Sequence, residues 1–376
     1  MTNENHLPKP SPVNFKQRKF TSIREIPRDQ WDAIWPPHTE GYDFYRSQEE
    51  AHLDGFEFFY LALYVDDTLA LLAPLFTAHF NVGLGMSDST RQQLERLQRH
   101  WPRLLVIKTL FCGSPTSEKG LMGIHPEFRQ NADLLRALDR ALIELAREHR
   151  VWMIVLKDFM SEDLNELDDL PSLGYFKTDG FPTARLAIEF GSVDEYLDRL
   201  SAGTRKDLRR KVKKTSESGR LQVEVAHDIS HCIDEVFQLY MNTYSAGPMH
   251  FELLTKEYFL NFSRYMPREA VYFLFWMNDK SEQGRRLVGF NFCLQFDDRL
   301  IDKYIGMDYS VSRDLNLYFI SLLNNVQWSI DHRKKIYILG AGEYSVKTRL
   351  GAELIPTRTM TKVVNPLIHW IAKRIS

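Results

Sequence analysis

The sequence predicts an α+β fold made of two copies of one domain. Each half of the chain reads as strand, strand, helix, strand, and each then closes on a Leu-Gly step followed by Pro-Thr. A repeat of roughly 180 residues is too long for one solenoid unit and fits two domains. Neighbouring strands also follow one another without the intervening helices of a doubly wound sheet. The closing words are Leu173-Gly174 with Pro182-Thr183, and Leu350-Gly351 with Pro356-Thr357.

The first half is predicted as one domain over residues 20–190, behind a flexible tail 1–19. Asp66-Asp67 marks the turn of a hairpin. Leucines at helical spacing from Leu135 to Leu145 predict a helix that Asn131 or Asp133 caps. The predicted elements are, in order, a helical or irregular segment 31–50, strands 58–64 and 69–76, a surface helix 87–100, a buried strand 104–111, the leucine-bearing helix and a strand 152–156.

The second half is predicted as a second domain over residues 191–376. Ser192 and Glu195 form a capping-box pattern at its first helix, and a basic stretch follows at 204–214. Apolar residues from Leu315 to Ile330 share one face of a long helix. The remaining predicted elements are strands 270–276, 287–296, 300–307 and 336–339, and a docking helix at 367–375.

Composition excludes several classes of protein. The chain has 376 residues, 44% hydrophobic and 26% charged, as is usual for soluble globular domains. A formal net charge of -2 gives no overall attraction to DNA or to an anionic membrane. No stretch reaches the ~18 apolar residues of a spanning helix, so we expect no membrane insertion. The first residues lack the apolar run of a signal peptide, so we expect a cytoplasmic protein.

The reactive residue types form none of the common catalytic patterns. Cys112, Cys232 and Cys293 are odd in number and far apart, which suits neither a disulfide framework nor a metal site. The histidines lack the HExxH spacing, and a Gly-x-Ser-x-Gly elbow is absent from the sequence. We therefore expect no metal, no serine nucleophile and a reducing compartment.

The strand 300–307 and the residues after it carry the first candidate site. Strict alternation would place Asp302, Tyr304, Gly306 and Asp308 on one face. Carboxylates that flank a tyrosine on a central strand are costly unless they are paired or face a cleft. The functional interpretation makes Asp308 a base or acceptor-orienting group and Tyr304 a proton donor. The structural alternative is a set of hydrogen-bonded polar groups at the end of a sheet.

A glycine-bearing turn at residues 340–347 is the second candidate. Its glycines serve turn geometry first. The turn would place Glu343, Tyr344 and Lys347 at the carboxyl-terminal edge of the sheet, where we expect them to join the catalytic set.

The basic stretch leaves three interpretations open. At helical spacing Arg205, Arg209 and Lys213 lie on one face. They could form a solvated helix face, a site for a polyphosphate or another anionic ligand, or a surface that touches a nucleic acid.

Four stretches resemble the FemAB-like branch of the GNAT superfamily, in which two GNAT-type domains sit in tandem. They cover the opening of the second domain, the end of one strand, the glycine turn, and the start of a helix in the first half. In order they are Ser201-Ala202-Gly203-Thr204-Arg205-Lys206-Asp207-Leu208-Arg209-Arg210-Lys211, Gly306-Met307-Asp308-Tyr309, Gly340-Ala341-Gly342-Glu343-Tyr344-Ser345-Val346-Lys347, and Gly123-Ile124-His125-Pro126-Glu127-Phe128-Arg129.

The resemblance implies an acyltransferase that forms an amide on a small-molecule or peptide amine. Acyl-CoA is the implied donor, aminoacyl-tRNA the alternative, and a non-catalytic binding protein the alternative of another class. In GNAT-type domains a splayed strand pair holds the donor and a helix N-terminus cradles its phosphates. The glycines of the usual phosphate loop are missing here, both at Gln130 and in the second half. We expect the second domain to be active, with donor contacts from Arg205, Arg209, Ser312, Arg313 and Asn316.

Overall fold

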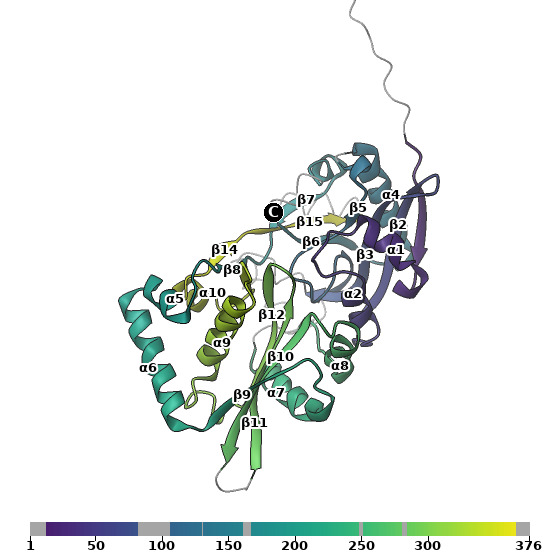
Figure 1. The fold of residues 1–376 in the computed structure, drawn as a ribbon. Helices are drawn as coiled ribbons and strands as arrows, with labels where there is room; N and C mark the ends of the chain where they lie inside the picture. The colour runs from purple at the N-terminus through teal and green to yellow at the C-terminus, as the bar shows by residue number, and fades with distance from the viewer. Residues whose placement is uncertain are drawn as a thin grey trace, which may run out of the picture.

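The computed structural model describes residues 13–81, 106–129, 131–160, 167–247, 251–279 and 284–365. Figure 1 shows two sheets with helices packed on them, the first half in purple and blue and the second in teal, green and yellow. The mixed α+β architecture that the sequence predicts is confirmed.

The first sheet has the strand order β1-β2-β3-β4-β6-β15-β7, and β5 pairs with β3 beside β4. Its strands are β1 (Lys16–Phe20), β2 (Glu57–Val65), β3 (Thr68–Asn81), β4 (Val106–Cys112), β5 (Gly123–Ile124), β6 (Met153–Met160), β7 (Phe176–Asp179) and β15 (Thr357–Val363). The helices of this half are α1 (Arg28–Ile34), α2 (Tyr42–Glu49) and α4 (Ala132–Glu148), with short 3-10 turns at Ile23–Glu25, Pro126–Phe128 and Leu170–Leu173.

The second sheet has the strand order β14-β8-β13-β12-β11-β10-β9. Its strands are β8 (Thr183–Ala187), β9 (Leu221–Ala226), β10 (Ala270–Asp279), β11 (Gly284–Gln295), β12 (Arg299–Met307), β13 (Ile336–Gly340) and β14 (Glu353–Ile355). The helices are α5 (Val193–Arg199), α6 (Ala202–Ser218), α7 (Ile233–Ala246), α8 (Lys256–Tyr265), α9 (Leu317–Asp331) and α10 (Tyr344–Arg349), with a 3-10 turn at Ser230–Cys232.

Each half lends one strand to the sheet of the other. The chain enters β8 at Thr183 and pairs it with β13 and β14, although β8 belongs to the first half by sequence. The chain enters β15 at Thr357 and pairs it with β6 and β7. The repeated Pro-Thr words therefore mark the starts of the two exchanged strands. Because each of these strands pairs in the sheet of the other half, the domain boundary at residue 190 stays a prediction.

Local signals explain most of the helices. Asn131 caps α4 by accepting from Asp133 N and Leu134 N, and the leucine stripe is buried, as predicted. At α5 the Ser192 hydroxyl accepts from Glu195 N, whereas the Glu195 carboxylate binds the N–H of Gly191, one residue earlier than the capping box predicts. The sequence analysis missed α7 and α8. Its predicted helices at 87–100 and 367–375 lie outside the described residues.

One apolar core spans both halves. Trp31, Phe44 and Tyr60 of the first half and Tyr258 and Phe259 of the second belong to the same buried cluster. Helices α1, α2, α7 and α8 contribute to this core, while α4 covers the other face of the first sheet and α9 the other face of the second. A shared core fixes the halves against each other, so side chains from both can form one site.

Candidate functional site

The strands β12 and β13 diverge in the middle of the second sheet. They pair in parallel only at Arg299↔Ile336, Leu300↔Tyr337 and Ile301↔Ile338. Beyond Ile301, β12 runs on to Met307 while remaining paired with β11 on its other side. Beyond Ile301, the edge of β12 that faces away from β11 is therefore not paired with β13. This is the splayed strand pair that the family resemblance implied.

A bulge at the point of divergence corrects the predicted alternation of side chains. Phe292 pairs with Tyr304 and Cys293 with Asp302, so Lys303 is an extra residue in β12. An extra residue shifts every later side chain to the opposite face. Asp302 therefore faces α9, and Tyr304 faces α7 and α8; the prediction that they share one face is wrong.

Asp302 belongs to a buried polar network beneath α9. Its carboxylate accepts from Asn291 Nδ2 at 2.6 Å and from the Tyr337 hydroxyl at 3.0 Å. Asn325 donates to both Asn291 and Tyr337. Burial raises the pKa of Asp302, while these hydrogen bonds act in the opposite direction. These hydrogen bonds join β11, β12, β13 and α9 and hold the two diverging strands in place, although Asn325 Oδ1 has no partner in the part of the chain that the structure describes.

Tyr304 faces a carboxylate that the sequence analysis did not identify. Its hydroxyl donates to Glu252 Oε1 at 2.9 Å, and its ring packs against those of Tyr240 and Tyr258. Burial raises the pKa of Glu252, and the Tyr304 hydrogen bond and then the charge of Lys157 oppose that rise. Burial also raises the pKa of Tyr304 far above its ordinary range. A carboxylate with a raised pKa holds a proton more readily than an ordinary glutamate and can therefore serve as a general base.

Glu252 was missed because nothing local marks it. It lies in the connection between α7 and α8, in a region for which no periodic pattern was assigned. Its partner Tyr304 is far away in sequence, so only the packing of the connection against β12 brings them together. One signal in the sequence could have pointed to this connection. Phe251 is a large apolar residue in a loop, and its ring packs against Phe111 of the first half.

Asp308 lies just beyond β12 in a tight turn. It forms an ion pair with Arg286 and accepts from the N–H and the hydroxyl of Ser310. Burial works against its charged form, but the bonds from Ser310 and Arg286 outweigh it and lower its pKa. A carboxylate with a lowered pKa is a poor proton acceptor at neutral pH. Its predicted role as a base stays untested, and its contacts suit an anchor of the turn.

The glycine turn holds Lys347 and Tyr344 in different settings. The buried Lys347 ammonium donates to the carbonyls of Leu339, Gly340 and Ala341, which uses all three of its protons. Burial lowers the pKa of Lys347. Tyr344 is half-buried next to Asp158 of β6, and burial raises its pKa. Glu343 is exposed, with a left-handed backbone. Lys347 thus stabilises the end of β13 by binding its last carbonyls, and Tyr344 lies on the side of the turn that faces the first half.

The loop before α9 is where the family resemblance implies a cradle for donor phosphates. It carries the candidate residues Ser312, Arg313 and Asn316. Its N–H groups bond to its own carbonyls: Ser312 N to Asp308 O, Asn316 N to Arg313 O and Leu317 N to Ser312 O, among others. A phosphate cradle needs N–H groups that point outward. As folded, this loop offers few of them.

The basic helix α6 is largely neutralised by its own surroundings. Arg205 and Arg209 approach Asp198, and Lys214 pairs with Asp314 at 2.8 Å. Arg210 and Lys211 both pair with Asp207. The loop before α9 touches α6 at Thr215, which lies about 15 Å along the helix axis from Arg205. The structure thus separates Arg205 and Arg209 from Ser312 and Asn316, and a donor-binding role for any of them stays a prediction.

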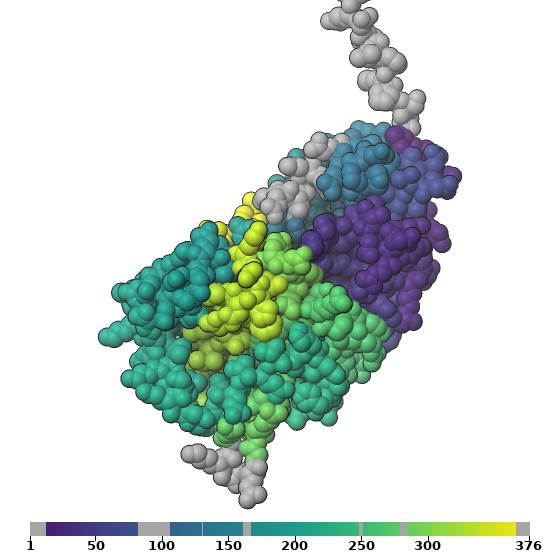
Figure 2. Space-filling view, viewed as in Figure 1, coloured from purple at the N-terminus to yellow at the C-terminus, as the bar shows by residue number. Residues whose placement is uncertain are grey.

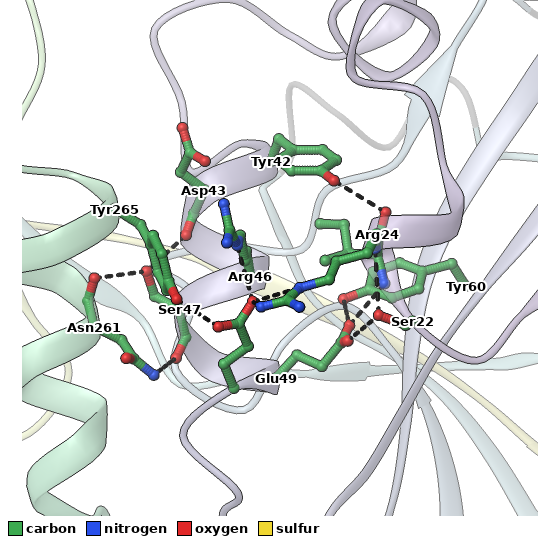
Figure 3. Close-up of polar contacts among 12 residues, drawn as sticks. Ser22, Arg24, Tyr42, Asp43, Arg46, Ser47, Glu49, Tyr60, Asn261 and Tyr265 are labelled. Carbon is green, nitrogen blue, oxygen red and sulfur yellow. Dashed lines mark hydrogen bonds and ion pairs between the residues drawn. The ribbon is translucent and has the colours of Figure 1, made fainter.

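The two halves are fastened together beside this site. In Figure 3 Tyr265 and Asn261 of α8 face Arg46 and Ser47 of α2. Glu50 accepts from Arg24, Arg46 and Tyr265, and these bonds overcome the effect of burial and lower its pKa to about 2. Figure 2 shows the yellow C-terminal region between the teal helices and the green and purple parts of the surface.

Two features are absent from the described residues. Among them, no group of three or more His, Cys, Asp or Glu side chains could hold a metal ion. In the same ranges no helix is both long and apolar enough to cross a membrane.

Comparison with known proteins places the fold and the family. The crystal structure of FemX superposes with a TM-score of 0.59 at 12% identity, over 95% of this chain and 99% of that one. A tandem GNAT protein from the clavulanic acid biosynthesis pathway superposes with a TM-score of 0.55 at 12% identity, over 94% and 99%. A search of curated proteins found no significant match. A family described by peptidoglycan biosynthesis/recognition matches residues 22–372. The chain therefore belongs to the FemAB-like family, as its motifs predicted.

Proposed function

We propose that this chain forms an amide by transferring an aminoacyl group from an activated ester to the amine of a peptidoglycan-precursor type of acceptor. Glu252 acts as the general base, and the reaction takes place on the face of β12 that carries Tyr304. The observation that carries the proposal is the 2.9 Å hydrogen bond between Tyr304 and Glu252 at the point where β12 leaves β13. The three cysteines are buried and free, which suits the reducing cytoplasm.

The proposed chemistry needs one proton acceptor and one oriented carbonyl. The acceptor nitrogen attacks the ester carbonyl and passes its proton to Glu252. The C–O bond of the ester then breaks, and the leaving oxygen takes up that proton from Glu252. Tyr304 keeps its own proton throughout and holds Glu252 in place through its hydrogen bond. The backbone of β12 beyond Ile301 can orient the carbonyl, as splayed strands do.

The aminoacyl donor is preferred because of the loop before α9. CoA carries a pyrophosphate that a helix N-terminus would hold through outward N–H groups. Here the loop contains no glycine from Asp308 to Asn316, and several of its N–H groups are engaged within it. The family's description also favours a peptidoglycan-related substrate.

Acyl-CoA is the second candidate, favoured by the divergence of β12 and β13. A strand edge that has lost its partner suits an extended amide-bearing chain such as pantetheine. Both donors would present their carbonyl to the same base.

An amide-formation assay tests the proposal. The full chain is incubated with radiolabelled aminoacyl-tRNA or acetyl-CoA and a peptidoglycan-precursor peptide that has a free amine, and the product is identified by mass spectrometry. Glu252→Gln keeps the size of the side chain and removes the base, so we expect at least a 100-fold loss of turnover, in line with roughly 10²–10⁴ for a general base. The matched control is Glu257→Gln, an exposed position at the start of α8.

Each outcome decides one part of the proposal. A product from aminoacyl-tRNA alone supports the preferred donor, and a product from acetyl-CoA alone replaces it with the second candidate. Full activity in Glu252→Gln would remove Glu252 from the mechanism. If neither donor reacts while the peptide binds, the chain is a binding protein.

A further inference from the structure

A bulge in β6 of the first half carries an ion pair. Lys157 Nζ lies 2.5 Å from Asp158 Oδ2. Asp158 has a left-handed backbone, with φ of 61°, and the pairing of β6 with β15 shifts register around it. Left-handed residues inside strands are uncommon and indicate that the surroundings enforce the geometry.

Residues 113–122 of the first half hold Lys157 from several directions. The Lys157 ammonium donates to Ser114 O at 3.1 Å. A Cβ added at Gly113 would lie 3.5 Å from Lys157 Cγ, and one added at Gly120 only 2.2 Å from Lys157 O. Gly120 N also donates to Asp158 O. Both the main chain and the side chain of Lys157 are thereby fixed.

The same face of β6 receives the connection that carries Glu252. Met153, Val155 and Lys157 lie on one face of β6, because side chains two residues apart share a face. Met153 and Val155 pack in a cluster with Phe111 and Phe251, whose rings lie 5.9 Å apart. Phe251 thus packs on the face of β6 that also carries Lys157, and Glu252 is the next residue in the chain. Burial raises the pKa of Glu252, and the positive charge of Lys157 opposes that rise.

Several other groups also interact with Glu252 and influence its pKa. Lys303 favours its charged form, as Lys157 does. Among the described residues, the other groups that interact with Glu252 are phenols, which stay neutral at physiological pH. They are Tyr304 of β12, Tyr240 and Tyr244 of α7, and Tyr258 of α8.

We propose that Lys157 of the first half is a positioning residue of the second-half site, where it stabilises the carboxylate of Glu252 and Asp158 moderates its charge. The inference rests on the proposed role of Glu252 as the base. It makes the first half a working part of the site, since that half supplies the charge that adjusts the base.

The test measures the titration of Glu252 directly. The full chain is labelled with ¹³C at the glutamate carboxyl, and the Glu252 resonance is assigned by its loss in Glu252→Gln. Removing the cation in Lys157→Met should raise the titration midpoint by roughly one pH unit. Removing the counter-charge in Asp158→Asn should lower it, and asparagine tolerates the left-handed backbone. Lys157→Arg keeps the charge and should leave the midpoint within a few tenths of a unit.

Opposite shifts in the two variants are the expected result, because a merely structural role would not move the midpoint in both directions. Unchanged midpoints in Lys157→Met and Asp158→Asn would overturn the inference. If Lys157→Met fails to fold, Asp158→Asn alone decides. Activity in Glu252→Gln would instead refute the proposed function, while the NMR midpoints would still report on Lys157.

Discussion

The two halves differ most just after their last parallel strand pair. In the first half β4 pairs with β6 up to Cys112↔Leu156, and the chain then leaves the sheet for residues 113–122 before it returns as β5. In the second half β12 pairs with β13 up to Ile301↔Ile338 and continues with a single extra residue, Lys303. Residues 113–122 of the first half thus occupy the position that the single bulged residue Lys303 occupies in the second half.

Beyond this point the halves correspond again. Gly123 pairs with Leu72 as Gly306 pairs with Phe290, and a helix packs closely over each glycine. A Cβ on Gly123 would lie 2.9 Å from Ile34 of α1, and one on Gly306 would lie 2.7 Å from the backbone of α7. The two quoted motifs that begin at these glycines therefore occupy equivalent places.

The difference shows how one fold serves two purposes. Residues 113–122 fill the diverging edge of the first half and fix Lys157, whereas β12 keeps its edge clear of β13. The two irregular points also meet: Lys303 donates to Thr116 O at 2.5 Å and pairs with the buried Glu40 at 2.6 Å. The two halves are therefore joined at residues 113–122 and Lys303, where their structures differ.

The largest expected effect comes from breaking this joint. In Lys303→Met the carboxylate of Glu40, 2% exposed, loses its partner. Removing one member of a buried pair costs about 3–5 kcal/mol. Denaturant unfolding should show this loss, and Lys303→Met combined with Glu40→Gln should recover much of it. A loss below about 1 kcal/mol in the single variant would mean that the ion pair does not join the halves.

A somewhat smaller effect should appear as a dependence of stability on pH. Burial, and then the neighbouring Glu40, raise the pKa of Glu118 from its ordinary 4.5 to about 7. The folded state then binds more protons than the unfolded state, so stability should fall as pH rises from about 4.5 to 7. The full change is about 3 kcal/mol. In Glu118→Gln this part of the decline should vanish; identical pH profiles would contradict the packing of residues 113–122.

The smallest effect separates a filled glycine position from an open one. Gly120→Ala should destabilise by about 1–3 kcal/mol, because its Cβ would strike the backbone of β6. Gly203→Ala is the control: its Cβ would meet nothing within 4 Å near the start of α6, so stability should rise by roughly 0.4–1 kcal/mol. Thermal melts compare the two. Equal effects would mean that residues 113–122 are not packed against β6.

The sequence predicted what depends on short-range pattern. The strands, the leucine-bearing helix and the Asn131 cap follow from local pattern, and the family was identified from the resemblance of four short motifs. The exchange of β8 and β15 could not be predicted, because two equivalent strands fit either sheet by pattern alone. The bulge at Lys303 was missed because strict alternation hides an extra residue. Glu252 required a contact across 52 residues. The three carbonyls that Lys347 binds could not be foreseen either, and its catalytic role stays a prediction.

The central claim is that the second half, with its clear strand edge, holds the acyl donor. The most direct measurement is hydrogen–deuterium exchange of the full chain with and without puromycin, a mimic of the aminoacyl end of tRNA, with desulfo-CoA in parallel. We expect slower exchange in peptides that cover residues 302–309 with at least one probe, and no change over 109–120. Protection confined to 109–120 would contradict it.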